Sequence, residues 1–159
     1  MQKESFFLSN NGVGVSFCIE NGIISQINLS NCDKTCFPEK SPFDKFFEKT
    51  FLYLSGKSVD FTEDLRLLNM EKFTFFQSQV YNILIKIKFG DFISYEKLAE
   101  KLGNKNLRRA VGRVLGLNPY PLVIPCHRVL PKNFSIKNIG GFSEGIDIKR
   151  RLLKIEKII

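Results

Sequence analysis

The stretch with the most chemical content ends in Pro125, Cys126 and His127, after an apolar run that begins at Leu122. A cysteine attacks as its thiolate, and an ordinary thiol has a pKa of about 8.5, so a base, a cation or an oriented water must help it to ionise. His127 is the only histidine of the chain. Neighbouring residues rarely bring a sulfur and an imidazole into direct contact, so we expect a water to bridge them. The alternative is that Cys126 is a small buried apolar residue.

The single histidine also limits the kinds of site that the chain can build. Sites with two or more His ligands are excluded, which removes most catalytic zinc centres and mononuclear iron centres. Cys32 and Cys36 form a C-x3-C pair with no histidine near them in the sequence. Three interpretations stay open for this pair: a weak zinc site, a local disulfide of the kind found in hyperthermophiles, and two free thiols, which we favour. We expect no metal and no cofactor.

The charge of the chain is unevenly distributed. Its 159 residues include 24 basic and 16 acidic residues, a net charge of +8. Residues 1–70 hold seven basic and nine acidic residues, a net charge of −2, so residues 71–159 carry +10. A basic half is typical of a protein that binds a polyanion, most simply nucleic acid. The alternative is a lysine-rich protein without such a partner.

The composition indicates a folded protein outside the membrane. The chain is 43% hydrophobic and 25% charged, which suits one domain or one domain with a small companion. It has no run of about 18 apolar residues, and its start lacks the basic-then-apolar order of a signal peptide. We therefore expect a cytoplasmic protein with reduced cysteines and no contact with membranes.

The first seventy residues must supply a support for this chemistry. Alternating apolar residues predict two strands that Asn21 and Gly22 join in a hairpin, because this pair favours the positive φ of a tight turn. Pro42 can begin a helix, since the first turn needs no N–H donor there, and Gly56 can end it. The expected elements are strands over 13–19 and 23–29, a loop over 30–40, a Phe-rich helix over 41–56, and a weakly patterned segment over 57–70 that could hold another strand and a linker.

The second half has the pattern of a helical unit. Thr74 and Gln77 form a capping-box pair, and Ser94 is an N-cap candidate. Two short helices around a turn at Gly103 predict a helix-turn-helix whose second helix is basic. The alternative is an ordinary helical pair with a solvated basic face. The expected helices cover 74–88, 95–102, 107–117 and 148–159, and the charges of the last helix are expected to be solvated, apart from Glu156.

From Thr74 to Glu156 the sequence resembles the O6-alkylguanine-DNA alkyltransferases. The matching pieces keep the order and spacing of that family, and the Pro-Cys-His-Arg core with Asn-Pro upstream is highly specific. They are Phe76–Gln77, Val80–Tyr81, Phe89–Gly90, Ser94–Tyr95, Leu98–Ala99, Arg109–Gly112, Asn118–Pro119, Pro121, Ile124–Val129, Gly140–Phe142, Lys149, Leu152–Leu153 and Glu156.

The resemblance implies an α+β fold of two domains. Residues 1–70 would form a small α/β support domain with an antiparallel, RNase H-like sheet. Residues 71–159 would form a mostly helical, winged-helix-like domain with a helix-turn-helix. This second domain would bind double-stranded DNA containing O6-alkylguanine through the minor groove, as a monomer, and flip the damaged base out of the stack, because a buried thiolate cannot reach a base inside a duplex.

The resemblance also implies roles for single residues. Cys126 would accept the alkyl group irreversibly, His127 would deprotonate it through a water, and Glu156 would orient the histidine; we call these three residues the relay. Tyr95 would assist the leaving guanine and contact a phosphate, and Asn118 would tie the helix-turn-helix to the active-site loop. The other implied contacts are Arg109 as the finger that enters the duplex, Ser94, Asn104, Arg108 and Arg113 on DNA, and Val129, Phe142 and Ser143 at the substrate pocket.

Three positions and one segment depart from the family pattern. Tyr81 stands where Trp is common, and Phe142 replaces a tyrosine of the pocket wall. Glu96 follows Ser94 and Tyr95, so we expect a mild repulsion from DNA phosphate. Residues 130–139 are about three residues longer than usual and should form a flap beside the pocket.

Three functions are compatible with these features. The first is single-turnover DNA repair, in which the alkyl group of O6-alkylguanine, and also of O4-alkylthymine, passes to Cys126. The second is a non-catalytic lesion sensor of the alkyltransferase-like kind, which lacks the acceptor cysteine. The third is a plain DNA-binding regulator. The presence of Cys126, His127 and Glu156 together favours the first.

Overall fold

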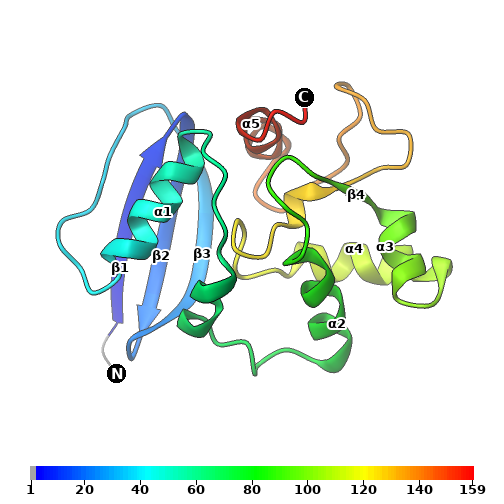
Figure 1. Cartoon of the computed structure of the whole chain (residues 1–159), viewed down its shortest axis with the longest axis horizontal. Coiled ribbons are helices and arrows are strands. Elements are labelled where there is room, and N and C mark those ends of the chain that lie inside the picture. The colour runs from blue at the N-terminus through cyan, green and yellow to red at the C-terminus, as the bar shows by residue number, and fades with distance from the viewer. Residues whose placement is uncertain (1–2) are drawn as a thin grey trace.

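The computed structural model describes residues 3–159 and has an α+β architecture. A three-stranded sheet carries one helix across a face, and the remaining helices gather beyond its third strand (Figure 1). Among residues 3–159 no helix is long and apolar enough to span a membrane. The elements are β1 (Lys3–Asn10), β2 (Gly12–Glu20), β3 (Ile23–Cys32), α1 (Asp44–Leu54), α2 (Phe75–Leu84), β4 (Ile93–Ser94), α3 (Tyr95–Lys101), α4 (Arg108–Gly116), β5 (Val129–Leu130) and α5 (Ile146–Ile155), with 3-10 helices at Thr62–Leu67, Lys105–Leu107 and Cys126–Arg128.

The sheet is antiparallel in the order β1-β2-β3. The predicted hairpin is confirmed, because β2 pairs with β3 and Asn21 and Gly22 have φ values of 53° and 76°. The strand β1 was not predicted. Its residues Phe6, Phe7 and Leu8 are apolar in succession, so they lack the alternation that marks a half-buried strand.

The helix α1 covers one face of this sheet and confirms the predicted Phe-rich helix, although it begins at Asp44 rather than at Ser41. Its Phe47 ring lies 4.9 Å from the ring of Phe17 on β2, measured between centroids. The strand considered for residues 57–70 is wrong. Asp60 accepts hydrogen bonds from the backbone and side chain of Thr62, which starts a 3-10 helix there instead.

The helices of the second half follow the prediction closely. Thr74 and Gln77 make the capping box at the start of α2, which ends at Leu84, four residues before the expected end. The hydroxyl of Ser94 caps α3 by accepting from the N–H of Lys97. The helices α3 and α4 pack on each other as the expected helix-turn-helix pair, and the turn between them contains a short 3-10 helix that the sequence did not predict.

The last helix differs from its prediction in extent and in burial. It runs from Ile146 to Ile155, so it begins and ends earlier than expected, and Lys157 leaves it with a φ of 59°. Its charges are not all solvated, because Lys149 has no exposed surface. A lysine normally stays at the surface, so nothing in the periodicity of the helix marked this one as buried.

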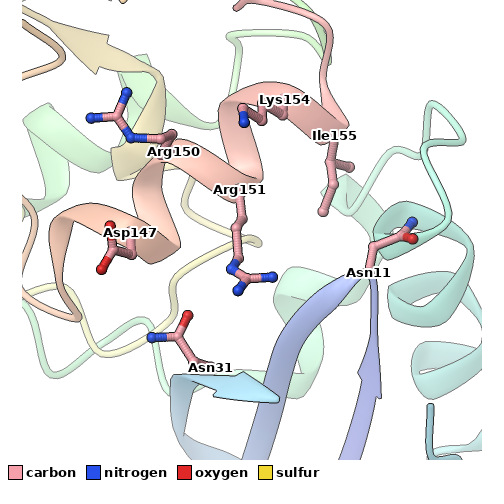
Figure 2. Close-up of a pocket in the computed structure, with 7 residues that line it drawn as sticks. All are labelled: Asn11, Asn31, Asp147, Arg150, Arg151, Lys154 and Ile155. Carbon is pink, nitrogen blue, oxygen red and sulfur yellow. The ribbon is translucent and has the colours of Figure 1, made fainter. Parts of the chain in front are cut away.

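The sheet and the helices share one continuous apolar core. The N–H of Ile27 on β3 donates to the carbonyl of Pro119 over 2.8 Å, which fixes the sheet to the loop that leads to Cys126. A pocket of about 570 Å³ lies between α5 and the strand ends, and Arg151 of α5 reaches across it toward Asn31 (Figure 2). Gly12 has a φ of 79°, which favours glycine in the turn between β1 and β2, and a Cβ there would also displace the flexible end of Arg151.

Candidate active site

Cys126 lies at the start of a 3-10 turn, and the residue is 3% exposed. The side-chain amide of Asn118 donates to the Cys126 sulfur over 3.1 Å and to the carbonyl of Ile124 over 2.8 Å, while its oxygen accepts from the N–H of Tyr120. Leu122, within the same loop, has a φ of 74° and is buried. One buried amide therefore holds both the loop and the thiol.

His127 faces a carboxylate from the other end of the second half. Its Nε2 lies 2.7 Å from Oε1 of Glu156, the residue that follows α5. Arg128 donates three hydrogen bonds to the same carboxylate and a fourth to the carbonyl of Ile87. The N–H of Gly90 donates to Oε2. The spacing that suggested the His127–Glu156 pair thus corresponds to a direct contact.

These contacts decide which nitrogen of His127 can act as a base. An ionised carboxylate only accepts hydrogen bonds, so Nε2 must carry the hydrogen that points to Glu156. Nδ1 is then the nitrogen with the free lone pair. It is buried and has no hydrogen-bond partner within residues 3–159. The basic position of the ring is therefore Nδ1.

The ionisation of the three groups follows from burial and neighbours. Burial raises the pKa of the Cys126 thiol to about 12, partly offset by the hydrogen bond from Asn118, so the thiol needs a base to react. Burial also lowers the pKa of His127, which keeps the ring neutral. Burial would raise the pKa of Glu156, but His127 and Arg128 lower it well below its usual range. The relay rests with a neutral thiol, a neutral imidazole and an ionised carboxylate.

A tyrosine from the first seventy residues joins this group. Tyr53 of α1 is fully buried, and its hydroxyl donates to Oε1 of Glu156 over 2.6 Å and lies 3.1 Å from Nε2 of His127. Sequence reasoning missed it, because Tyr53 lies next to the apolar face of a Phe-rich helix and looks like an ordinary core aromatic. The only signal was the phenol itself, which must find a partner when buried.

Lys149 is the second residue whose place in the site was not predicted. Its Nζ donates to the carbonyls of Val129 and Gly141 over 2.9 and 3.1 Å. Burial lowers its pKa to about 8, while the nearby Cys126 acts in the opposite direction. A buried cation beside the thiol would favour the thiolate once the thiol ionises.

A cavity of about 170 Å³ opens onto the sulfur. Of the three residues that the resemblance implied at the pocket, Phe142 and Ser143 belong to its wall, together with Tyr95, whereas Val129 does not line it and instead pairs with Ile93 in the parallel β4–β5 pair. The hydroxyl of Ser143 donates to the neighbouring Glu144. Burial raises the pKa of Tyr95, so this phenol stays protonated and can donate. The complete lining is Tyr95, Gly112, Leu115, Gly116, Cys126, Gly141, Phe142 and Ser143.

The predicted DNA contacts lie on the helix-turn-helix. Arg108, Arg109 and Arg113 are exposed on α4. Ser94 and Asn104 use their side-chain oxygens to cap the helices α3 and Lys105–Leu107, which shapes the motif. An open hollow of about 530 Å³ lies beside this helix. It is lined by Tyr95, Asn106, Arg108 and Arg109.

The long segment over 130–139 is tied to the first helix of this motif. Lys132 forms an ion pair with Glu96 over 2.7 Å, and the rings of Phe92 and Phe134 lie 5.2 Å apart. Glu96 therefore has a partner that was not expected from the sequence, and its expected repulsion from phosphate is reduced by Lys132. Cys32 and Cys36 are both free thiols.

Comparisons with known proteins agree with this geometry. Residues 75–158 match the family model of the 6-O-methylguanine DNA methyltransferase DNA-binding domain. A methylated-DNA–protein-cysteine methyltransferase of Sulfurisphaera tokodaii is 34% identical over 139 residues, which cover 87% of this chain and 83% of the relative. The crystal structure of the O6-methylguanine-DNA methyltransferase of Pyrococcus kodakaraensis strain KOD1 is 30% identical, covers 97% of both chains and has a TM-score of 0.73.

A Mycobacterium tuberculosis protein solved in complex with DNA has the same fold, with a TM-score of 0.71 at 24% identity, over 97% of this chain and 93% of its own. The fold and the buried Cys-His-acid arrangement define a DNA-repair protein that acts by alkyl transfer. The chain belongs to the methylated-DNA–protein-cysteine methyltransferase family. Its partner is DNA.

Proposed function

We propose that Cys126 is the alkyl acceptor and that His127 and Glu156 activate it. The thiol proton passes through a bridging water to Nδ1 of His127, and the sulfur then attacks the alkyl carbon in line. The S–C bond forms as the bond between that carbon and the guanine oxygen breaks. The bond electrons leave with the guanine, and the product is an S-alkylcysteine. The open lone pair at Nδ1 and the ionised Glu156 support this assignment.

We propose that Tyr95 serves the leaving base. Its phenol lies in the wall of the cavity that holds the sulfur and stays protonated, so it can give a proton to the departing guanine at O6 or N3. His127 then releases to solvent the proton that it took from Cys126, and the Tyr95 phenolate takes up a proton from solvent, so no net proton is lost. Ser143 and Phe142, in the same wall, would contact the flipped base.

We propose O6-alkylguanine in double-stranded DNA as the lesion, and O4-alkylthymine as a second one. A cavity of about 170 Å³ at the sulfur suits a small alkyl group on a flipped base. Arg109 would enter the duplex through the minor groove, with Arg108 and Arg113 on the backbone, since a planar guanidinium can stack in the gap. The protein would act as a monomer.

We also propose the finer description of the fold. Residues 1–70 form a support domain with an RNase H-like sheet, and residues 71–159 form a winged-helix-like domain. The change of architecture near residue 70 and the short parallel pair β4–β5 beside the helix-turn-helix support this division.

One observation carries the proposal: the thiol of Cys126 lies in a small cavity beside a buried His–Glu pair. The test is the intact mass of the protein after incubation with a duplex that contains O6-methylguanine. We expect a gain of one CH2 group, at most once per molecule, mapped to Cys126 and absent in Cys126→Ala. The matched control Cys18→Ala should react like the natural chain. A folded protein that binds the duplex without gaining mass would be a lesion sensor instead.

A further inference from the structure

Glu156 of the relay accepts a hydrogen bond from Tyr53, which lies outside the half of the chain that contains Cys126. Tyr53 lies on α1, 74 residues before His127 and 103 residues before Glu156. Its hydroxyl shares Oε1 of Glu156 with Nε2 of His127. The ring of Tyr53 packs edge-on against Phe89, so the phenol has little freedom to turn elsewhere.

The direction of these hydrogen bonds is determined by charge. Burial and the facing Glu156 raise the pKa of Tyr53 well above its usual range, so the phenol keeps its proton. The carboxylate can only accept, so Tyr53 donates to it. Oε1 therefore receives donors from α1, from His127 and from Arg128. A carboxylate oxygen shared in this way holds less negative charge for the imidazole alone.

We propose that Tyr53 is a positioning residue, through which the first seventy residues hold Glu156 in place and keep His127 neutral with its lone pair on Nδ1. This inference rests on the proposed function of the relay. It gives the sheet and α1 a part in the reaction beyond support: without the phenol, Glu156 would stabilise a protonated imidazole more strongly, and a protonated His127 cannot accept the thiol proton.

The charged groups around His127 come from several elements. Glu156 at the end of α5 favours the protonated ring, whereas Arg128 from the same turn and Lys149 of α5 disfavour it. Cys126 is the adjacent residue and is neutral at rest. Tyr53→Phe changes none of these charges. It removes one donor from Glu156 together with the 3.1 Å contact between the same hydroxyl and Nε2 of His127, so its effect on His127 reports on the loss of this one hydroxyl.

The test compares Tyr53→Phe with Tyr120→Phe in the full chain. Tyr120 is a matched control, because it is also fully buried and, within residues 3–159, its hydroxyl hydrogen-bonds only with the backbone of Asn69. The first measurement is the rate of transfer from O6-methylguanine DNA to Cys126 as a function of pH, at saturating duplex. The second is the titration of the ring protons of His127 by NMR, which needs no assignment in a chain with one histidine.

For Tyr53→Phe we expect two midpoints to rise together by about one pH unit: that of the acid limb of the rate profile and that of the His127 titration. At a pH below the acid limb, this shift corresponds to a loss of transfer rate of about tenfold. Tyr120→Phe should move neither. Overlapping profiles for Tyr53→Phe and the natural chain would overturn the inference while the proposed function stands. A natural chain that transfers no alkyl group would overturn the proposed function instead, and the titration would still test the contact.

A third measurement does not depend on whether the variant folds. In the natural chain, the long-range proton–nitrogen spectrum of His127 should show a hydrogen on Nε2 and none on Nδ1 at pH 8. A hydrogen on Nδ1 would contradict the proposed arrangement, because Nε2 would then have to face the carboxylate as a lone pair.

Discussion

Replacing Glu156 with Gln should destabilise the protein strongly, although the two side chains have the same shape. The Glu156 side chain is fully buried, and Arg128, whose side chain is 7% exposed, gives three hydrogen bonds to its carboxylate. Glutamine removes the negative charge and turns an NH2 group toward a donor of Arg128 or Gly90. The guanidinium is then left without a counter-charge.

Breaking a buried ion pair from one side costs about 3–5 kcal/mol of unfolding free energy. Domains of this size shift by about 2–4 °C for each kcal/mol, so we expect the midpoint of thermal unfolding to fall by roughly 6–20 °C. The assay is calorimetry at pH 7. Glu96→Gln is the matched control, because it makes the same chemical change in a pair with the exposed Lys132, and it should leave the midpoint unchanged.

In acid, the difference in unfolding midpoint between the natural chain and Glu156→Gln should become smaller. The pKa of Glu156 is lower in the folded protein than its ordinary value of 4.5, so its stabilising effect is complete above that pH and is lost as the pH falls below it. Equal midpoints for Glu156→Gln and Glu96→Gln at pH 7 would refute the reasoning, and so would a gap that does not shrink in acid.

Three further predictions concern other parts of the molecule. The pKa of Lys149 falls from 10.5 to about 8 on folding, so the natural chain should gain about 1.4 kcal/mol of stability per pH unit from pH 8 to 10.5 relative to Lys149→Met, as measured by urea unfolding. Arg109→Ala should weaken duplex binding about tenfold by fluorescence anisotropy and leave the unfolding midpoint unchanged. Gly12→Ala and Gly22→Ala should each cost about 1–2 kcal/mol and lower the midpoint by similar amounts, because both have positive φ and the end of Arg151 beside Gly12 can move aside; a much larger loss for Gly12→Ala would contradict this.

Much of the site could be predicted from the sequence, because its signals are local or keep a fixed spacing. Cys126 and His127 are neighbours in the sequence, and the resemblance to the alkyltransferase family added Asn118, eight residues before the thiol, and Glu156. The hairpin, the capping box and the two helices of the motif were also predicted, since each depends on short-range backbone chemistry.

The residues that were missed depend on tertiary packing. Tyr53 and Lys149 are recognised as part of the site only when α1 and α5 are placed against the loop of Cys126. A core tyrosine and a helix lysine are common, and their position along the chain does not reveal what their polar ends contact. The strand β1 and the 3-10 helix Thr62–Leu67 were missed because their patterns are weak in isolation.

Leu122 in the loop before Cys126 combines a strained backbone with a buried side chain, and these two features have opposite effects on stability. A leucine in the left-handed region costs about 1–2 kcal/mol, and glycine there would relieve that cost. Truncating a buried leucine, however, typically costs about 3–5 kcal/mol through the cavity that it leaves, and Leu122 is only 2% exposed. Because the loss of packing outweighs the relief of backbone strain, leucine is the better residue here. An engineer who seeks a more heat-resistant variant should therefore leave this strained position alone, because every residue that relaxes the backbone also empties the core beneath it.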